Sequence, residues 1–131
     1  MKIDLEIMKT IFNVLIDSPD VFIKNTELSD AVPDENALYF HFLLMLDNGF
    51  ITGTDLLSTP ESTGVHSGRD KVSFRCRYIR LSQRGLDFAN ALNQPKIMTR
   101  LKKICMDASM DILVSTGKSL MSNWIQDQLH L

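Results

Sequence analysis

The sequence contains few potential metal ligands. Its 131 residues include two cysteines and three histidines. Cys76 and Cys105 lie far apart and match no metal-binding or redox spacing. His41, His66 and His130 are scattered and form no His-x-x-x-His pair. We therefore predict no metal site, two reduced and buried thiols, and a half-buried His41 within a helix.

Long apolar runs are also missing. No stretch approaches the roughly 18 apolar residues that a membrane-spanning helix needs. Acidic residues already occur within positions 1–6, and no small-residue cleavage site follows an apolar stretch. These absences predict no membrane partner and no targeting signal, which implies a cytoplasmic location.

Sequence motifs of common enzymes are absent. The sequence has no Gly-x-Gly-x-x-Gly, no Walker loop and no Gly-x-Ser-x-Gly. Asp34 and Glu35 are adjacent, so on a helix their side chains diverge by about 100° and cannot flank one scissile bond. We predict a protein that is not an enzyme and needs no cofactor.

Charge is distributed unevenly along the chain, although the net charge is only −2. Residues 1–62 carry three bases and eleven acids, whereas residues 69–103 carry ten bases and two acids. Residues 104–131 return to a net charge of −2. Such segregation bears on association and on the steering of charged partners, and it says little about the fold.

Hydrophobic periodicity and turn residues predict a mixed α+β domain. Helices are expected over residues 4–16, 33–47, 82–93, 96–107 and 109–128, with a short helix or turn over 26–32. Strands are expected over residues 21–23, 50–57 and 72–81, and residues 58–71 read as a mobile loop. The last two strands would form a hairpin around this loop. Alternation predicts one apolar face with Val72, Phe74, Cys76 and Tyr78, and one face with Ser73, Arg75, Arg77 and Ile79.

This order of elements is typical of a winged helix-turn-helix with a two-stranded wing and added C-terminal helices. Residues 43–51 (LLMLDNGFI) look like the corner that leads many winged helices into the wing. Residues 81–86 (LSQRGL) resemble the element that leaves the wing in many bacterial regulators. Together with residues 39–44 (YFHFLL), they resemble a phage- and prophage-associated winged-helix family of uncharacterised function. We predict a winged-helix domain over residues 1–94 and a helical extension over 95–131, packed on that domain or on a dimer partner.

A basic wing is the strongest functional signal. Arginine side chains offer planar forks of donors that suit phosphate oxygens. The alternative is a solvated strand face, or one that pairs with the acidic N-terminal half. The residues predicted to bind nucleic acid are Arg69, Lys71, Arg75, Arg77, Arg80 and Arg84.

The helix over residues 33–48 contains no Lys or Arg and three acids, which disfavours base reading in the major groove. Its predicted outward face is apolar and acidic, which suits a protein partner, unless the C-terminal helices cover it. Predicted interface residues on this helix are Asn36, Tyr39, Phe40 and Leu43.

The last helix carries a second apolar stripe with Gly117 in its middle. Leu113, Leu120 and Trp124 are predicted either to form a homodimer seam or to pack on their own core. The leading function is a non-enzymatic DNA-binding regulator that contacts the phosphate backbone through its wing. The alternative is a protein-binding accessory factor, such as an inhibitor or adaptor of a host protein.

Overall fold

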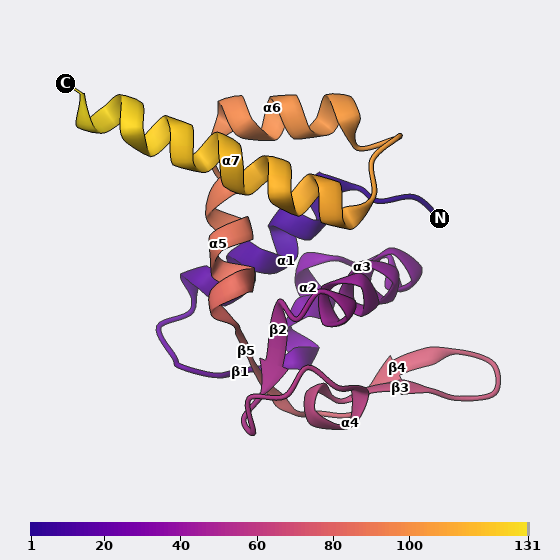
Figure 1. The fold of residues 1–131 in the computed structure, drawn as a ribbon. Helices are drawn as coiled ribbons and strands as arrows, with labels where there is room; N and C mark the ends of the chain where they lie inside the picture. Colours follow the sequence, from indigo (N-terminus) through magenta and orange to yellow (C-terminus); the bar gives the residue numbers. More distant parts are fainter. Residues whose placement is uncertain (131) are drawn as a thin grey trace.

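A computed structural model describes residues 1–130, which fold into an α+β structure in which helices pack on a three-stranded antiparallel sheet and a separate two-stranded hairpin extends to one side (Figure 1). The helices are α1 (Leu5–Asp17), η1 (Asn25–Glu27, a 3-10 helix), α2 (Leu28–Ala31), α3 (Glu35–Asp47), α4 (Pro60–Thr63), α5 (Gln83–Leu92), α6 (Pro95–Ile104) and α7 (Met110–Leu129). The strands are β1 (Ile23–Lys24), β2 (Ile51–Gly53), β3 (Val65–Ser67), β4 (Val72–Phe74) and β5 (Tyr78–Leu81).

The larger sheet has the strand order β1-β5-β2, and both neighbours run antiparallel to β5. Ile23 is paired with Ile79, and Ile51 with Leu81. Strands β3 and β4 form a separate two-stranded hairpin, in which Val65 is paired with Phe74. The chain therefore leaves the larger sheet after β2, builds the hairpin, and returns to the sheet in β5.

Three phenylalanine rings join the helices to the larger sheet. Phe12 of α1 lies 5.7 Å from Phe50 and 6.1 Å from Phe88 of α5, measured between ring centroids. Phe50 and Phe88 stack at 5.4 Å. Burial of large aromatic side chains supplies much of the hydrophobic stabilisation in a small core. This cluster fixes α1 and α5 over the start of β2.

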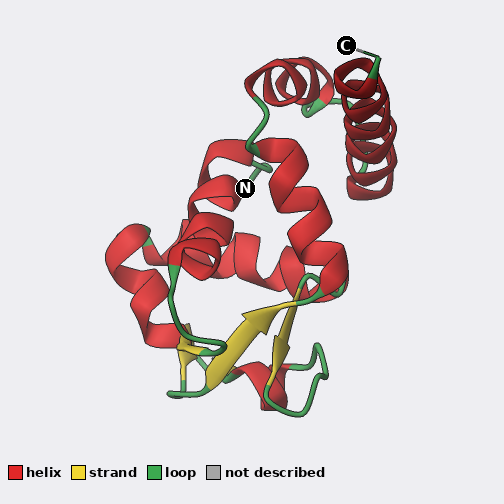
Figure 2. Cartoon of the chain, turned by 90° about the vertical axis from the view of Figure 1, so that its left-hand side faces the viewer, coloured by secondary structure: helices red, strands yellow, loops and turns green. Residues whose placement is uncertain are grey.

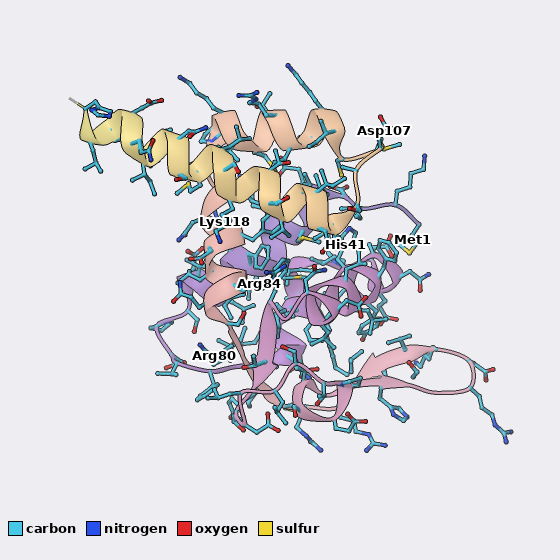
Figure 3. All side chains as sticks on the ribbon, viewed as in Figure 1. Met1, His41, Arg80, Arg84, Asp107 and Lys118 are labelled. Carbon is cyan, nitrogen blue, oxygen red and sulfur yellow. The ribbon has the colours of Figure 1, made fainter. Side chains whose placement is uncertain are left out.

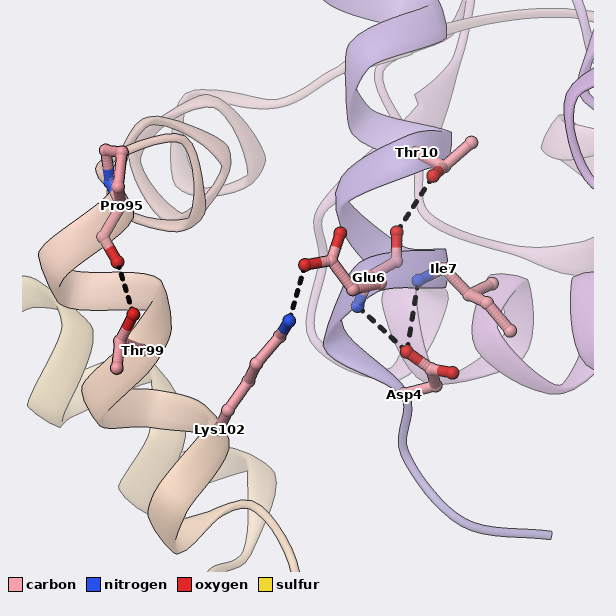
Figure 4. Close-up of polar contacts among 7 residues, drawn as sticks. All are labelled: Asp4, Glu6, Ile7, Thr10, Pro95, Thr99 and Lys102. Carbon is pink, nitrogen blue, oxygen red and sulfur yellow. Dashed lines mark hydrogen bonds and ion pairs between the residues drawn. The ribbon is translucent and has the colours of Figure 1, made fainter.

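The C-terminal helices lie at the opposite end of the molecule from the sheets (Figure 2). Helix α7 packs against α5 and α6 through the buried Leu113 and Gly117. An ion pair between Lys102 of α6 and Glu6 of α1 tethers this layer to the first helix (Figure 4). Asp4 caps α1, because its carboxylate accepts the backbone N–H groups of Glu6 and Ile7.

The predicted helices are confirmed, with bounds shifted by a few residues. The predicted hairpin between residues 50–57 and 72–81 is wrong, because the strands that pair in the hairpin are β3 and β4. Strand β2 ends at Gly53, and the segment predicted as a mobile loop contains α4 and β3. The single strand predicted over residues 72–81 is two strands in different sheets, because residues 75–77 leave the ladder between them.

The break at residues 75–77 changes which side chains face the core. Ile79 is fully buried, whereas Tyr78 is about half exposed, opposite to the predicted alternation. Cys76, predicted to be buried, is exposed, while Cys105, at the end of α6, is partly buried against the core. Because β4 and β5 belong to different sheets, the alternation of side chains along β4 does not continue into β5.

His41 lies deeper than predicted and has both ring nitrogens hydrogen-bonded. Nδ1 lies 2.7 Å from the carbonyl oxygen of Ala37, and the N–H of Asp4 donates to Nε2 at 2.8 Å. This arrangement gives His41 a structural role in fixing the start of α1 against α3. Within residues 1–130 there is no group of three or more His, Cys, Asp or Glu residues that could hold a metal ion. In the same range, the helices are too short or too polar to cross a membrane.

Candidate functional site

A cleft of about 560 Å³ lies where α3, α4 and the β3–β4 hairpin meet. Its walls combine bases, one acid and apolar side chains, and we call it the basic cleft. It is lined by Leu43, Pro60, Glu61, Gly64, Val65, His66, Ser67, Arg75 and Arg77.

Buried Asn25 fixes the backbone from which two of these arginines project. Its side-chain amide donates to the carbonyl oxygens of Thr63 at 2.8 Å and Arg75 at 2.7 Å. The side-chain oxygen of Asn25 accepts the N–H of Arg77, and the Asn25 N–H donates to the Arg77 carbonyl oxygen at 2.9 Å. Each buried group thus has a partner, and the segment between β4 and β5 is held in one conformation.

Gly64 allows the chain to pass close to this segment. Its φ of +86° is unfavourable for residues with a side chain. A Cβ atom at this position would lie 2.2 Å from the Arg75 carbonyl oxygen and 2.5 Å from the amide nitrogen of Asn25. The Arg75 N–H donates to the Gly64 carbonyl oxygen at 2.7 Å. Glycine is therefore required where the cleft floor meets the arginine segment.

The cleft arginines are available to a ligand. Both Arg75 and Arg77 are exposed, and within residues 1–130 the ion pair between Glu6 and Lys102 is the only salt bridge. Arg77 uses one nitrogen, Nη1, to donate to the Cys76 carbonyl oxygen at 3.0 Å. Within residues 1–130, neither arginine therefore forms an ion pair with an acid. This differs from the alternative in which the acidic N-terminal half pairs with the basic strand.

Two further predicted bases lie at the tip of the β3–β4 hairpin, over residues 68–71. Arg69 and Lys71 are exposed there, on either side of Asp70. The Gly68 N–H donates to the Lys71 carbonyl oxygen at 2.9 Å and closes the turn. This hairpin tip projects away from the helical body (Figure 1), so its bases extend the positive surface beyond the cleft.

The remaining two predicted bases lie apart from the hairpin tip, on the β5 and α5 side of the molecule (Figure 3). Arg80 is half-buried on β5, opposite Thr52 of β2. Arg84 donates through Nε to the Asn48 carbonyl oxygen at 2.9 Å, and its guanidinium lies 5.8 Å from the centroid of the Phe50 ring. The six predicted bases thus form no single face, because β4 and β5 belong to different sheets.

The predicted outward face of α3 is partly covered by the hairpin. Tyr39 is only 9% exposed, and its ring packs edge-on against Phe74 of β4 at 4.9 Å, which corrects its predicted outward position. Burial, with a contribution from Glu35, raises the pKa of the Tyr39 phenol. Phe40 is half-buried and Asn36 is exposed.

Leu43 alone among these α3 residues reaches the basic cleft, with 36% of its surface exposed. The hairpin therefore covers part of the outward face of α3. The sequence had suggested, as an alternative, that the C-terminal helices would cover this face.

The apolar stripe of α7 is used largely within the chain. Leu113 is fully buried, and Leu120 and Trp124 are partly buried against the core. Gly117 lies close to α5 and α6, since a Cβ atom there would be 3.4 Å from Phe88 and 3.5 Å from Leu101. These contacts explain the stripe by intramolecular packing.

Beside this stripe, α5 and α7 enclose a second groove of about 630 Å³. It has an apolar floor and a polar rim. The lining residues are Gln83, Arg84, Asp87, Phe88, Asn90, Val114, Lys118, Met121, Ser122 and Ile125.

Sequence reasoning identified Leu43, Arg75 and Arg77 among the residues that line the basic cleft. It missed the other lining residues, Pro60, Glu61, Gly64, Val65, His66 and Ser67, and the supporting Asn25. His66 falls in the segment interpreted as a mobile loop, although it pairs with Ser73 across the hairpin. Asn25 occupies a polar turn and has no local pattern that marks it as buried. Its importance arises from three chain segments that meet only in the folded structure.

Comparison with known proteins yields no match to a family model, to a curated protein or to a solved structure. The resemblance to a phage-associated winged-helix family therefore stays a prediction.

Proposed function

We propose that this chain is a non-enzymatic winged-helix protein that binds nucleic acid through phosphate contacts. The winged-helix part is supported by the order α1, β1, α2, α3, β2, β5 and by the strand order β1-β5-β2. Helices α2 and α3 are joined by the three residues 32–34, a length that suits a helix-turn-helix. In this proposal the hairpin and the following arginine segment take the place of the wing.

The observation that carries the nucleic-acid proposal is the pair of exposed, unpaired arginines on a fixed backbone at the basic cleft. Arg75 and Arg77 present guanidinium groups suited to phosphate oxygens. His66 and Ser67 add side chains capable of hydrogen bonding at the same cleft. Arg69 and Lys71 at the hairpin tip extend this basic surface. An extended basic surface suits the backbone of a nucleic acid, whose phosphate charges are regularly spaced.

The proposed contact is sequence-tolerant. Helix α3 contains Glu35 and Asp47, its N-cap is Asp34, and it has no Lys or Arg, so phosphates flanking a major groove would repel it. Part of its outer face is already occupied by Phe74 of the hairpin. Phosphate contacts position a protein on nucleic acid without reading bases. This combination favours backbone binding over recognition of an operator sequence.

The test is a double substitution, Arg75→Ala with Arg77→Ala. We expect affinity for several unrelated labelled DNA sequences to fall by at least about tenfold and to a similar extent, because charge-assisted hydrogen bonds contribute about 1.5–3 kcal/mol each. The matched control is Lys96→Ala with Arg100→Ala, which removes two exposed charges from α6. Equal loss in both double variants, or none in the cleft variant, would refute the proposal.

A second candidate function is protein binding, as an accessory factor that inhibits or recruits a host protein. The groove between α5 and α7 favours it, because apolar Phe88, Met121 and Ile125 lie within a polar rim. Ile125→Asp would then abolish capture of a protein from nuclease-treated host lysate while leaving nucleic-acid affinity unchanged. Capture that requires intact nucleic acid would instead favour the first function.

A further inference from the structure

We infer that the basic cleft accepts one unstacked nucleotide of a single strand, with the base inside the cleft and its phosphate on Arg75 and Arg77. The inference rests on the proposed function and specifies its ligand. The cleft volume of about 560 Å³ falls within the roughly 300–1,000 Å³ typical of small-molecule sites. A phosphate group alone would need only Arg75 and Arg77 and would leave the rest of the cleft empty.

The lining of the cleft combines the apolar and the cation-bearing surfaces that a nucleotide requires. Leu43, Pro60 and Val65 provide apolar surface for the face of a base. Arg75 and Arg77 provide donors for phosphate, and guanidinium planes also stack on bases. Hydrogen bonds from a base edge can be met by His66 and Ser67 without a requirement for one particular base.

Glu61 distinguishes a base from a second phosphate. Glu61 lines the same cleft and belongs to the four-residue helix α4. A second phosphate placed beside it would meet like charge, whereas the amino groups of a base would donate to it. The cleft is thus suited to one anionic and one neutral part, which a single nucleotide supplies.

A duplex fits this surface less well than a single strand. Bases within a duplex are stacked and paired, and bringing one into a pocket costs a few kcal/mol of unstacking. Leu43 connects the cleft to α3, whose exposed acids would repel the second strand. A flexible single strand can instead pass along the arginines and turn one base inward.

The experiment compares three probes of equal length at one salt concentration: labelled dT12, a twelve-unit abasic strand with the same phosphates, and a 12-bp duplex. We expect the wild-type protein to bind dT12 about tenfold or more tightly than the abasic strand, since one stacked base contributes that factor. The duplex should bind more weakly than dT12.

A substitution at the base wall then locates the effect. Leu43→Asp should remove the preference for dT12 over the abasic strand, because the new charge faces the base and Leu43 is 36% exposed in the native fold. Ile112→Asp, at an exposed position on α7, is the control and should keep the preference. Circular dichroism checks that both variants are folded, and Leu43→Ser replaces Leu43→Asp if the latter unfolds.

The outcomes separate this inference from the proposed function. Equal affinity for dT12 and the abasic strand, with binding still lost on Arg75→Ala with Arg77→Ala, would overturn the nucleotide inference and leave backbone binding intact. Equal or tighter binding of the duplex would also overturn it. No binding to any of the three probes would refute both.

Discussion

Among individual residues, Asn25 has the largest influence on the candidate site. It is fully buried, and its side chain links η1 to the residues just before and just after the β3–β4 hairpin, Thr63 and Arg75. A buried polar side chain is costly unless its hydrogen bonds are made, and those of Asn25 are directed to backbone groups that have no strand partner. The geometry of the arginine segment therefore depends on one amide group located about fifty positions earlier in the sequence.

We predict that Asn25→Ala destabilises the protein by about 3 kcal/mol, because each buried backbone group left without a partner costs about 1–3 kcal/mol. The free energy of unfolding is measured by urea denaturation. Asn36→Ala, at an exposed position on α3, serves as the control and should stay within about 0.5 kcal/mol of wild type. If the two variants were equally stable, the role assigned to Asn25 would be incorrect.

The residues that sequence reasoning misplaced share a physical cause. Tyr78 and Ile79 were assigned to the wrong faces because alternation was continued across residues 75–77. Arg75 and Arg77 instead form hydrogen bonds with Asn25, which lies about fifty positions earlier in the sequence. Local periodicity carries no information about such long-range contacts, so the arginines could be recognised from sequence and their grouping could not.

At the scale of elements, the helices were predicted well and the strands poorly. Helix starts carry local signals, such as Asp34 and Ser82, whose side chains accept from backbone N–H groups in the first turn. Strands of two to four residues offer too few positions to establish a period of two. The pairing of β1 with β5 also depends on residues more than fifty positions apart.

Gly117 provides a test of how closely α7 packs on α5. We predict that Gly117→Ala leaves stability unchanged or raises it by up to about 1 kcal/mol, because alanine favours helix and its Cβ would make ordinary contacts of 3.4–3.6 Å. Gly117→Leu should cost about 1–3 kcal/mol, since the larger side chain would collide with Phe88 and Leu101. Thermal unfolding of the two variants measures this difference, and a fully tolerated leucine would contradict the close packing.

The contact between α6 and α1 predicts a pH effect on stability. The hydrogen bond and charge of Lys102 lower the pKa of Glu6 against the opposing effect of desolvation. Because the pKa of Glu6 is lower in the folded than in the unfolded protein, ionised Glu6 stabilises the fold. This stabilisation is fully present above the unfolded pKa of about 4.3 and is lost as the pH falls through the folded-state pKa. Because both side chains are about half exposed, the contribution is at most about 1 kcal/mol.

We therefore expect Lys102→Met to be less stable than wild type at pH 7, with a difference that shrinks as the pH falls below the unfolded pKa of about 4.3 and is lost once Glu6 is protonated in the folded protein. Lys103→Met, the adjacent exposed lysine without an ion pair, should show no such pH dependence. Urea midpoints recorded across this pH range provide the measurement. A difference that persists at low pH would assign the effect of Lys102 to packing.

At the scale of the whole molecule, the basic stretch of the sequence is divided mainly between two regions. Four bases lie on α6, and four lie on the hairpin and the arginine segment beside the cleft: Lys96, Arg100, Lys102 and Lys103 in the first group, and Arg69, Lys71, Arg75 and Arg77 in the second. Glu6 with Lys102 is the only ion pair within residues 1–130 that joins the acidic and basic parts of the sequence. The cleft bases are therefore left to act on an external anion, which is the central claim of the account.

The salt dependence of binding tests this claim most directly, because it counts the phosphates that the protein neutralises. Affinity for labelled dT12 and for a duplex is measured over a series of salt concentrations for wild type, Arg75→Ala with Arg77→Ala, and Lys96→Ala with Arg100→Ala. We predict that the cleft variant lowers the slope of log K against log salt by about 1.4 for the single strand and about 1.8 for the duplex, while the α6 variant keeps the wild-type slope. Identical slopes for wild type and the cleft variant would contradict the account.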